Sequence, residues 1–198
     1  MARPRSAAPK RSSRATRSSD GRTASRARRG SSRRRTTTEL TNLETKLGEV
    51  IGLAMAAQAA TDKIAKLTDD RELKRQLKTM KDEAAMGERR GTEIAGTFTG
   101  KKRAIMKEAR DVKQKASKMM STYLDRSADG LDGFEFLTMA EAGEVGHWTV
   151  LEHLNKQAKH SGVRELTRMQ LPIQRRHLKE AMAGSIKIAE KEDATGAA

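Results

Sequence analysis

Apolar residues recur at spacings of three and four along most of the chain, which is the period of a helix buried on one side. The clearest stretch is 134–160, and the same period predicts further helices over 38–67, 71–98, 101–124 and 163–190. No stretch alternates apolar and polar residues in the manner of a half-buried strand. The pattern therefore predicts an all-α protein.

One face of the predicted helix 134–160 is apolar apart from two residues. Its positions are Leu137, Ala140, Glu144, His147, Leu151 and Leu154. A carboxylate and an imidazole one turn apart in an apolar stripe are costly to bury unless a partner satisfies them. Either a metal ion or a hydrogen-bonded network would supply that partner. His153 and His160 fall away from this face, and we expect both to be solvated.

Local signals define the ends of several predicted helices. Thr38 or Thr41 would cap the first helix, and Thr41 and Glu44 have the spacing of a capping box. Asp69 or Asp70 would cap the second helix. Residues 126–133 are interpreted as a loop, and Ser161-Gly162 as the C-terminal cap of the helix that precedes it. Pro172 should either kink the last helix or mark the start of its regular part.

The order of the helices predicts the topology. Short loops make 38–98 and 134–190 two antiparallel hairpins, and 101–124 becomes a long crossover between them. The apolar stripe of this crossover is thin, so we expect it to be a partly exposed connection. Residues 38–190 would thus form a four-helix bundle with one crossover, and 191–198 should fray.

The N-terminal segment has a different composition from the rest. Residues 1–38 carry a net charge of +12, whereas the remainder carries only +3. Arg, Ser, Ala and Thr dominate the segment, and its apolar content is too low to offset the entropy of ordering. We therefore predict that residues 1–37 are a disordered basic arm.

Such an arm can neutralise phosphates along nucleic acid without reading its sequence. It has no aromatic residues for base stacking. The basic residues predicted to make these contacts are Arg3, Arg5, Lys10, Arg11, Arg14, Arg17, Arg22, Arg26, Arg28, Arg29, Arg33, Arg34 and Arg35. Two other interpretations stay open: a solubilising tail, and an organellar targeting peptide, which is also rich in Arg and Ser.

Composition excludes several classes of function. The chain has no cysteine, so disulfides, thiolate zinc sites and cysteine nucleophiles are excluded. No apolar run has the roughly 18 to 20 residues that a membrane span needs. The N-terminus lacks the apolar core of a secretory signal. Ser, Thr and Asp are common, but no nucleophilic triad is indicated. We expect a cytoplasmic protein, associated with the nucleoid if the arm binds DNA.

Three short motifs resemble those of the ferritin-like superfamily, in particular rubrerythrin-type and small bacterial stress-associated domains. Glu144-Val-Gly-His147 resembles the third bundle helix of that group, and the segment from Gln174 to His177 resembles the fourth. The segment that contains Glu83 resembles the second. The resemblance implies a ferritin-like four-helix bundle over 38–190 and a site for iron or manganese. The ligands that it implies are Glu83, Glu144, His147 and His177, with Gln58, Met86 and Gln174 around them.

The chain departs from the family pattern at several of these positions. Met86 stands where the family has histidine on the second helix, and Gln174 where it has glutamate on the fourth. On the first helix, Ala54 and Gln58 occupy the turn of the expected glutamate, and Glu49 lies too early. The remaining ligands suit one metal ion better than two. A buried network is the alternative, with Glu83 and Glu144 accepting hydrogen bonds from His147, His177 and Gln174.

Three functions follow as hypotheses. The first is a stress-associated protein that binds nucleic acid through its arm and keeps only a degenerate metal site. The second is an oxidase or peroxide-handling enzyme that depends on iron or manganese. The third is a metal-free interaction module that forms a homodimer, in which the polar cluster fixes helix register.

Overall fold

The computed structural model describes residues 39–195, and these form five helices and no strand. In chain order they are α1 (Asn42–Ile64), α2 (Arg71–Ala95), α3 (Lys102–Tyr123), α4 (Gly130–Ala158) and α5 (Ser161–Ala189). The prediction of an all-α protein is confirmed for this part of the chain. The predicted arm, 1–37, lies outside the described residues, as do 196–198 at the C-terminus.

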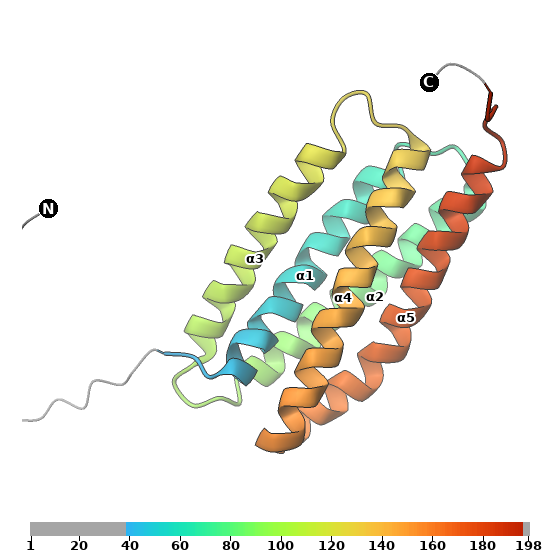
Figure 1. Ribbon diagram of the computed structural model, residues 1–198. Coiled ribbons are helices and arrows are strands. Elements are labelled where there is room, and N and C mark those ends of the chain that lie inside the picture. The colour runs from blue at the N-terminus through green and yellow to red at the C-terminus, as the bar shows by residue number, and fades with distance from the viewer. Residues whose placement is uncertain (1–38, 196–198) are drawn as a thin grey trace, which may run out of the picture. The chain divides into compact units, whose positions relative to one another are not determined.

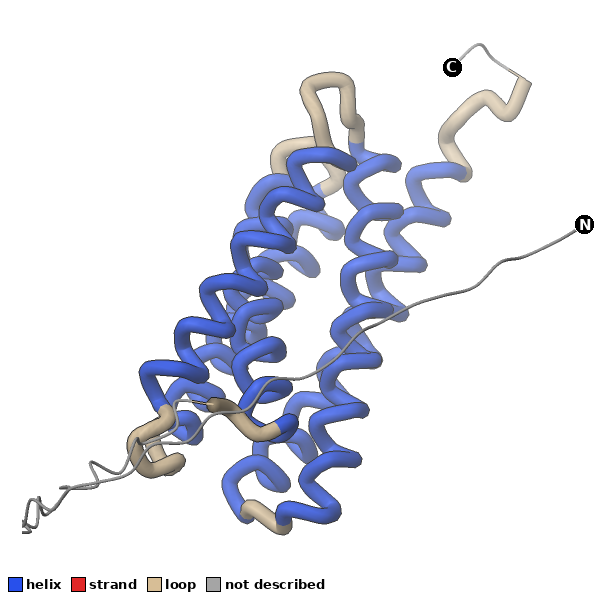
Figure 2. Tube along the Cα trace, turned by 60° about the vertical axis from the view of Figure 1, so that its left-hand side comes forward, coloured by secondary structure: helices blue, strands red, loops and turns tan. Residues whose placement is uncertain are grey.

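Four helices pack around a common interior, and the fifth lies outside them. α1 packs against α2 and α4, and α5 packs against α4 and α2, while α3 lies along α1. The helices alternate in direction along the chain (Figures 1 and 2). α2 and α4 consequently run parallel, and α3 leads the chain back along the bundle between them. The crossover predicted for 101–124 is thus a helix of 22 residues.

Both predicted N-terminal caps of the first hairpin are present. The Thr41 hydroxyl accepts from the Glu44 N–H at 3.3 Å, and the Glu44 carboxylate accepts from the Thr41 N–H at 2.7 Å. Asp70 caps α2, because one carboxylate oxygen accepts from the N–H groups of Glu72 and Leu73 at 2.9 and 3.1 Å. These bonds satisfy amide groups that have no partner inside the helix.

The prediction of a loop over 126–133 is wrong at its C-terminal end. α4 begins at Gly130, with Asp129 as its cap, four residues before the predicted start. Asp129 accepts from the Asp132 N–H at 3.0 Å, and Asp132 accepts from the Asp129 N–H at 3.1 Å. This reciprocal capping box outweighs the two glycines that suggested a loop. Gly133 also packs closely on Ile64, where a Cβ would lie 3.1 Å from the isoleucine side chain.

The turn between α4 and α5 also differs from the prediction. Lys159 adopts the left-handed conformation that ends α4, with φ of 55°, and α5 begins at Ser161. Ser161-Gly162 therefore opens a helix rather than capping one. The Asn155 amide fixes the turn by donating to the His160 carbonyl at 3.0 Å and accepting from the His160 N–H at 2.9 Å.

His160 is a structural residue, so the prediction that it is solvated is wrong. Its ring nitrogen Nδ1 accepts from the Val163 N–H at 3.3 Å and caps α5. Its ring stacks on Phe98 with 4.5 Å between the centroids, and its Nε2 lies 3.1 Å from the Thr97 hydroxyl. The residue thus joins the α4–α5 turn to the end of α2. His153, by contrast, is exposed as predicted.

Two glycines on α1 allow α3 to approach closely. A Cβ on Gly52 would lie 2.3 Å from the Ala109 carbonyl oxygen, and one on Gly48 would lie 2.8 Å from that of Ile105. Ile105 and Ala109 are also the only fully buried residues of α3. The crossover is therefore partly exposed, as predicted, but its N-terminal half is packed tightly against α1.

The last helix continues through Pro172, which lies on its exposed side. Pro172 therefore does not mark the start of the regular part of α5, which begins eleven residues earlier at Ser161. The interior beneath α5 holds two apolar clusters, around Trp148 at one end and Phe134 at the other. Buried polar residues lie between them, and these form the candidate site.

Candidate functional site

The centre of the bundle holds a buried set of polar side chains from three helices. His177 on α5 donates from Nε2 to the Glu83 carboxylate on α2 at 2.7 Å. Its other ring nitrogen lies 3.7 Å from the carboxylate of Glu141 on α4. Arg176 on α5 also pairs with Glu83 at the surface end of the set. His177 is therefore held between two carboxylates.

Gln174 extends this set along the interior. With its amide oriented to donate, Nε2 lies 3.0 Å from Glu141 Oε2 and 3.2 Å from Glu144 Oε2. Glu141, Glu144 and Gln174 are between 2 and 4% exposed. We call this set the interior polar network: Glu83, Glu141, Glu144, Gln174 and His177.

Burial and neighbouring charges set the protonation of the network. Removal from water raises the pKa of Glu144 well above its ordinary value, and the charge of Glu141 raises it further. The nearby Trp148 indole N–H lowers the pKa of Glu144 in part, although the two groups do not form a hydrogen bond of good geometry. Burial and the neighbouring charge thus both favour the neutral form of Glu144.

The environment favours the charged forms of His177 and Glu83, whereas it favours the neutral form of Glu144. Burial alone would lower the pKa of His177, but the carboxylates of Glu141 and Glu83 raise it above its ordinary value. Burial would raise the pKa of Glu83, but the bonds from Arg176 and His177 outweigh it and lower the pKa. The network therefore favours a charged imidazolium next to an ionised carboxylate.

His147 is not part of this network. Its Nδ1 lies 2.9 Å from a carboxylate oxygen of Glu49 on α1, and that carboxylate also pairs with Lys46. The His147 side chain is 39% exposed, in contrast to 2% for His177. Glu144 and His147 thus face different neighbours, although one turn of α4 separates them.

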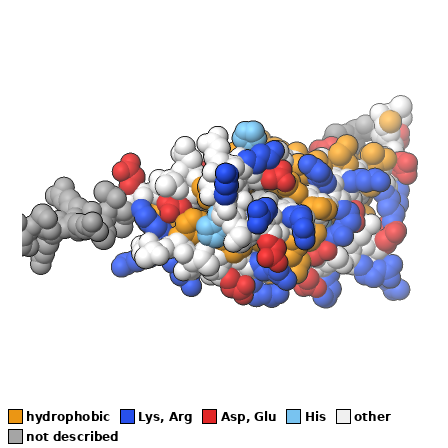
Figure 3. Space-filling model, turned by 90° about the horizontal axis from the view of Figure 1, so that it is seen from below, with side chains coloured by type: hydrophobic (Ala, Val, Ile, Leu, Met, Phe, Trp, Pro, Cys, Tyr) orange, Lys and Arg blue, Asp and Glu red, His pale blue; other side chains and the backbone are white. Residues whose placement is uncertain are grey.

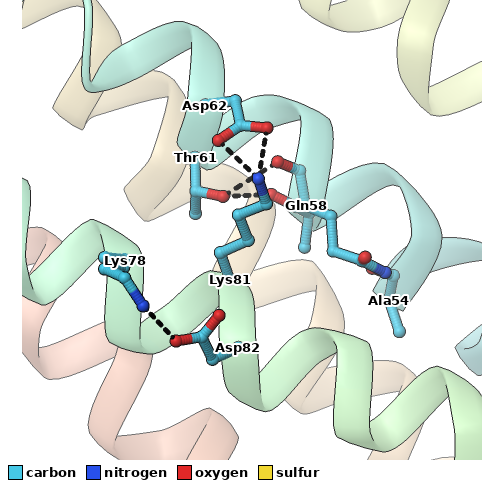
Figure 4. Close-up of polar contacts among 8 residues, drawn as sticks. Ala54, Gln58, Thr61, Asp62, Lys78, Lys81 and Asp82 are labelled. Carbon is cyan, nitrogen blue, oxygen red and sulfur yellow. Dashed lines mark hydrogen bonds and ion pairs between the residues drawn. The ribbon is translucent and has the colours of Figure 1, made fainter.

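The residues predicted to surround a metal lie apart as well. Gln58 donates to the Glu88 carboxylate of α2 at 2.7 Å and to the Ala54 carbonyl at 3.1 Å. Figure 4 shows Gln58 on α1 beside the salt bridge between Asp62 on α1 and Lys81 on α2, whose two nitrogen–oxygen distances are 2.7 and 2.8 Å. Met86 is half-buried on α2. Only Gln174 belongs to the interior polar network.

The described residues do not fit the metal site that the resemblance implies. Within 39–195, no group of three or more His, Asp or Glu side chains is placed to hold a metal ion. Glu83 is already bonded by His177 and Arg176, and His147 by Glu49. The predicted alternative is present in two of its contacts, since Glu83 accepts from His177 and Glu144 from Gln174.

Glu141 was missed because the inner face of α4 lies about one residue away from the predicted stripe. The buried positions are Phe134, Glu141, Trp148 and Asn155 in one row and Leu137, Glu144 and Leu151 in the next. Ala140, His147 and Leu154 lie at the edge of this face and are only partly buried. The single Trp, seven residues after Glu141, is the signal that would have placed the face correctly.

The surface of the described body carries both signs of charge. Figure 3 views the bundle from the end that carries the α4–α5 turn, and Lys and Arg alternate there with Asp and Glu. Ion pairs such as Lys107–Asp111 on α3 and Lys78–Asp82 on α2 contribute to this mixture. The thirteen basic residues predicted to contact nucleic acid, from Arg3 to Arg35, lie outside the described residues.

The sequence matches no protein-family model, no curated protein and no solved structure. Among residues 39–195, no helix combines the length and the apolar character needed to cross a bilayer.

Proposed function

We propose that this chain is a nucleic-acid-binding protein in which the N-terminal arm makes the contacts and the helical bundle is the folded body attached to it. The observation that carries the proposal is the uneven charge. The first 38 residues hold a net +12, whereas the other 160 hold +3. Because phosphate contacts release condensed counterions, a dense row of arginines binds duplexes without reading their sequence.

The body supports this division of roles. Its acidic and basic side chains are intermixed and many are paired, so the bundle has no broad surface of one sign in the view of Figure 3. A DNA-binding surface is normally a basic patch or stripe on one face. Binding by the arm alone predicts low sequence specificity and a strong dependence on salt.

The salt dependence gives a quantitative test. We would measure binding of the full-length protein to a fluorescent random-sequence duplex over a range of salt concentrations. Each phosphate contact contributes about 0.9 to the slope of log K against log salt. The triple variant Arg33→Gln, Arg34→Gln, Arg35→Gln should therefore reduce the slope by about 2 to 3.

The matched control removes the same number of charges from the body. Lys113, Lys115 and Lys118 are exposed on α3, and their replacement by glutamine should leave the slope unchanged. If the α3 variant loses as much slope as the arm variant, the bundle takes part in binding. If neither variant changes the slope, the proposal is wrong.

We further propose that the bundle is a ferritin-like domain whose metal site has been replaced by the interior polar network. The parallel α2 and α4, joined by a crossover along the bundle, support the fold assignment. The pairing of His177 with Glu83 supports the loss of metal. Protein purified after growth with added iron and manganese should contain no stoichiometric metal. Metal that is bound by the full-length protein and lost on replacing His147 and His177 by alanine would restore the oxidase hypothesis.

A further inference from the structure

A cavity of about 170 Å³ lies between α1, α3 and α4, and His177 is not among its lining residues. Alanines and leucines from α1 and α4 form much of its wall, and Phe136 and Met120 complete it. Met119 on α3 and Met139 on α4 also line it and are 41 and 40% exposed. These two methionines place the entrance between α3 and α4.

The cavity follows from small side chains at a point where three helices meet. α1 contributes Ala56, Ala57 and Ala60, and α3 contributes Ala116 to the same wall. The glycine contacts that draw α3 onto α1 lie at Ile105 and Ala109, two to three turns away from this wall. α3 makes little contact with α4, so no side chain fills the space between them.

The charged groups on the cavity wall are acids. Glu141 and Glu144 line it, together with His147, and no Lys or Arg is among the lining residues. The lining residues of α1 and α3 are uncharged. Two cations lie behind the lining: His177 on α5, which is held between Glu141 and Glu83, and Lys46 on α1, which lies 3.4 Å from His147 and pairs with Glu49. The Trp148 side chain is 1% exposed and lowers the pKa of Glu144. Its indole N–H has no hydrogen-bond partner among the described residues.

We propose that this cavity binds a small cationic amphiphile, a primary amine with a compact apolar body, whose ammonium group pairs with Glu144 and Glu141. The apolar wall would take up the body of the ligand, and methionine side chains adapt readily to ligands of different shape. A cavity of about 150 Å³ is known to hold a benzene ring, so the volume suits a single ring or a short alkyl chain. An anion would meet two acids and no Lys or Arg among the lining residues.

Binding should release a proton. Burial beside Glu141 raises the pKa of Glu144 and so favours its neutral form in the free protein. An ammonium group next to Glu144 favours its ionised form. Glu141 already has two partners, the His177 imidazole at 3.7 Å and the Gln174 amide at 3.0 Å. The proton therefore leaves Glu144 for the solvent as the amine enters. The affinity for an amine should then rise with pH, by up to about tenfold per unit, until Glu144 ionises in the free protein.

Benzylamine, benzyl alcohol and benzoate test the proposal on the full-length protein, because they share a ring and differ in charge. Isothermal titration calorimetry should show that benzylamine binds at least tenfold more tightly than benzyl alcohol, and that benzoate does not bind. Repeating the benzylamine titration in two buffers of different ionisation enthalpy should show the release of one proton.

Two variants locate the binding. Glu144→Gln keeps the shape of the side chain and should abolish both the preference for the amine and the proton release. Ala57→Leu fills the cavity without touching the acids and should weaken both benzylamine and benzyl alcohol. Equal affinity for the amine and the alcohol, no binding of benzylamine, or binding that neither variant changes would each overturn the proposal. All of these outcomes are independent of nucleic-acid binding by the arm.

Discussion

Replacing Gly52 by alanine tests the close contact between α1 and α3. The added Cβ would lie 2.3 Å from the Ala109 carbonyl oxygen and 2.8 Å from Val112 Cβ. Because the obstacle is backbone, no side-chain rotation relieves the clash, and α3 must move away from α1. Overpacking of this kind costs about 1 to 3 kcal/mol, and the upper end applies here. Alanine regains about 1 kcal/mol of helix propensity, so we expect a net loss of about 2 kcal/mol.

Gly143→Ala is the matched control, since it makes the same change inside a helix. Gly143 lies on α4 with no atom within 4 Å of its added Cβ, so only the propensity gain applies. By differential scanning calorimetry, we expect Gly52→Ala to lower Tm by about 4 to 8 °C and Gly143→Ala to raise it by about 1 to 4 °C. If the two variants shift Tm in the same direction by similar amounts, the close α1–α3 packing described above is refuted.

Three further predictions concern the polar residues. Glu144→Gln should be more stable than the wild type at pH 7 and equal to it near pH 4. Because the pKa of Glu144 is raised in the folded state, folding takes up a proton above the ordinary glutamate pKa. The stability of the wild type therefore falls by up to about 1.4 kcal/mol per pH unit in that range. A difference in urea unfolding that stays constant across pH would contradict this. His177→Gln should lose more stability at pH 6 than at pH 9, because the raised pKa of His177 gives a contribution that is full below pH 6.5 and is lost as pH rises through the folded value. A penalty that grows with pH would reverse the sign and refute the ion pair with Glu83. His160→Ala should cost about 1 to 3 kcal/mol through the lost cap and the lost stacking on Phe98. The exposed His153→Ala should stay within about 0.5 kcal/mol of wild type in the same unfolding assay, and equal values for the two would count against a structural role for His160.

Helix type and number could be predicted because they depend on local signals. The capping box at Thr41 and the Asp70 cap act within three residues, so they are legible without tertiary information. The start of α4 differs from the prediction because two glycines indicate a loop, whereas the Asp129 cap begins a helix at Gly130. A glycine that packs closely on another helix, as Gly133 does on Ile64, cannot be told from a loop glycine by sequence alone.

The site was predicted less well, because it depends on the rotation of each helix about its axis. A rotation of about one residue on α4 brings Glu141 inside and moves His147 to the edge. The pairing of His147 with Glu49 then requires the separation and rotation of α1, which no pattern within α4 contains. His177 and Glu83 were found because both lie near the centre of their inner faces, where a small rotation changes little.

The asymmetric attachment of α3 has a consequence for hydrogen exchange. All of its fully buried residues lie in the first half of the helix, and the second half, from Val112 to Tyr123, has none. Because opening free energies follow local burial, amide protons of the second half should exchange before those of α1 or α5 without unfolding of the bundle. Ala116, Met119 and Met120 lie in this weakly anchored half and line the cavity. Local opening of half a helix, rather than a lid or a domain movement, would therefore widen the entrance to the cavity between α3 and α4.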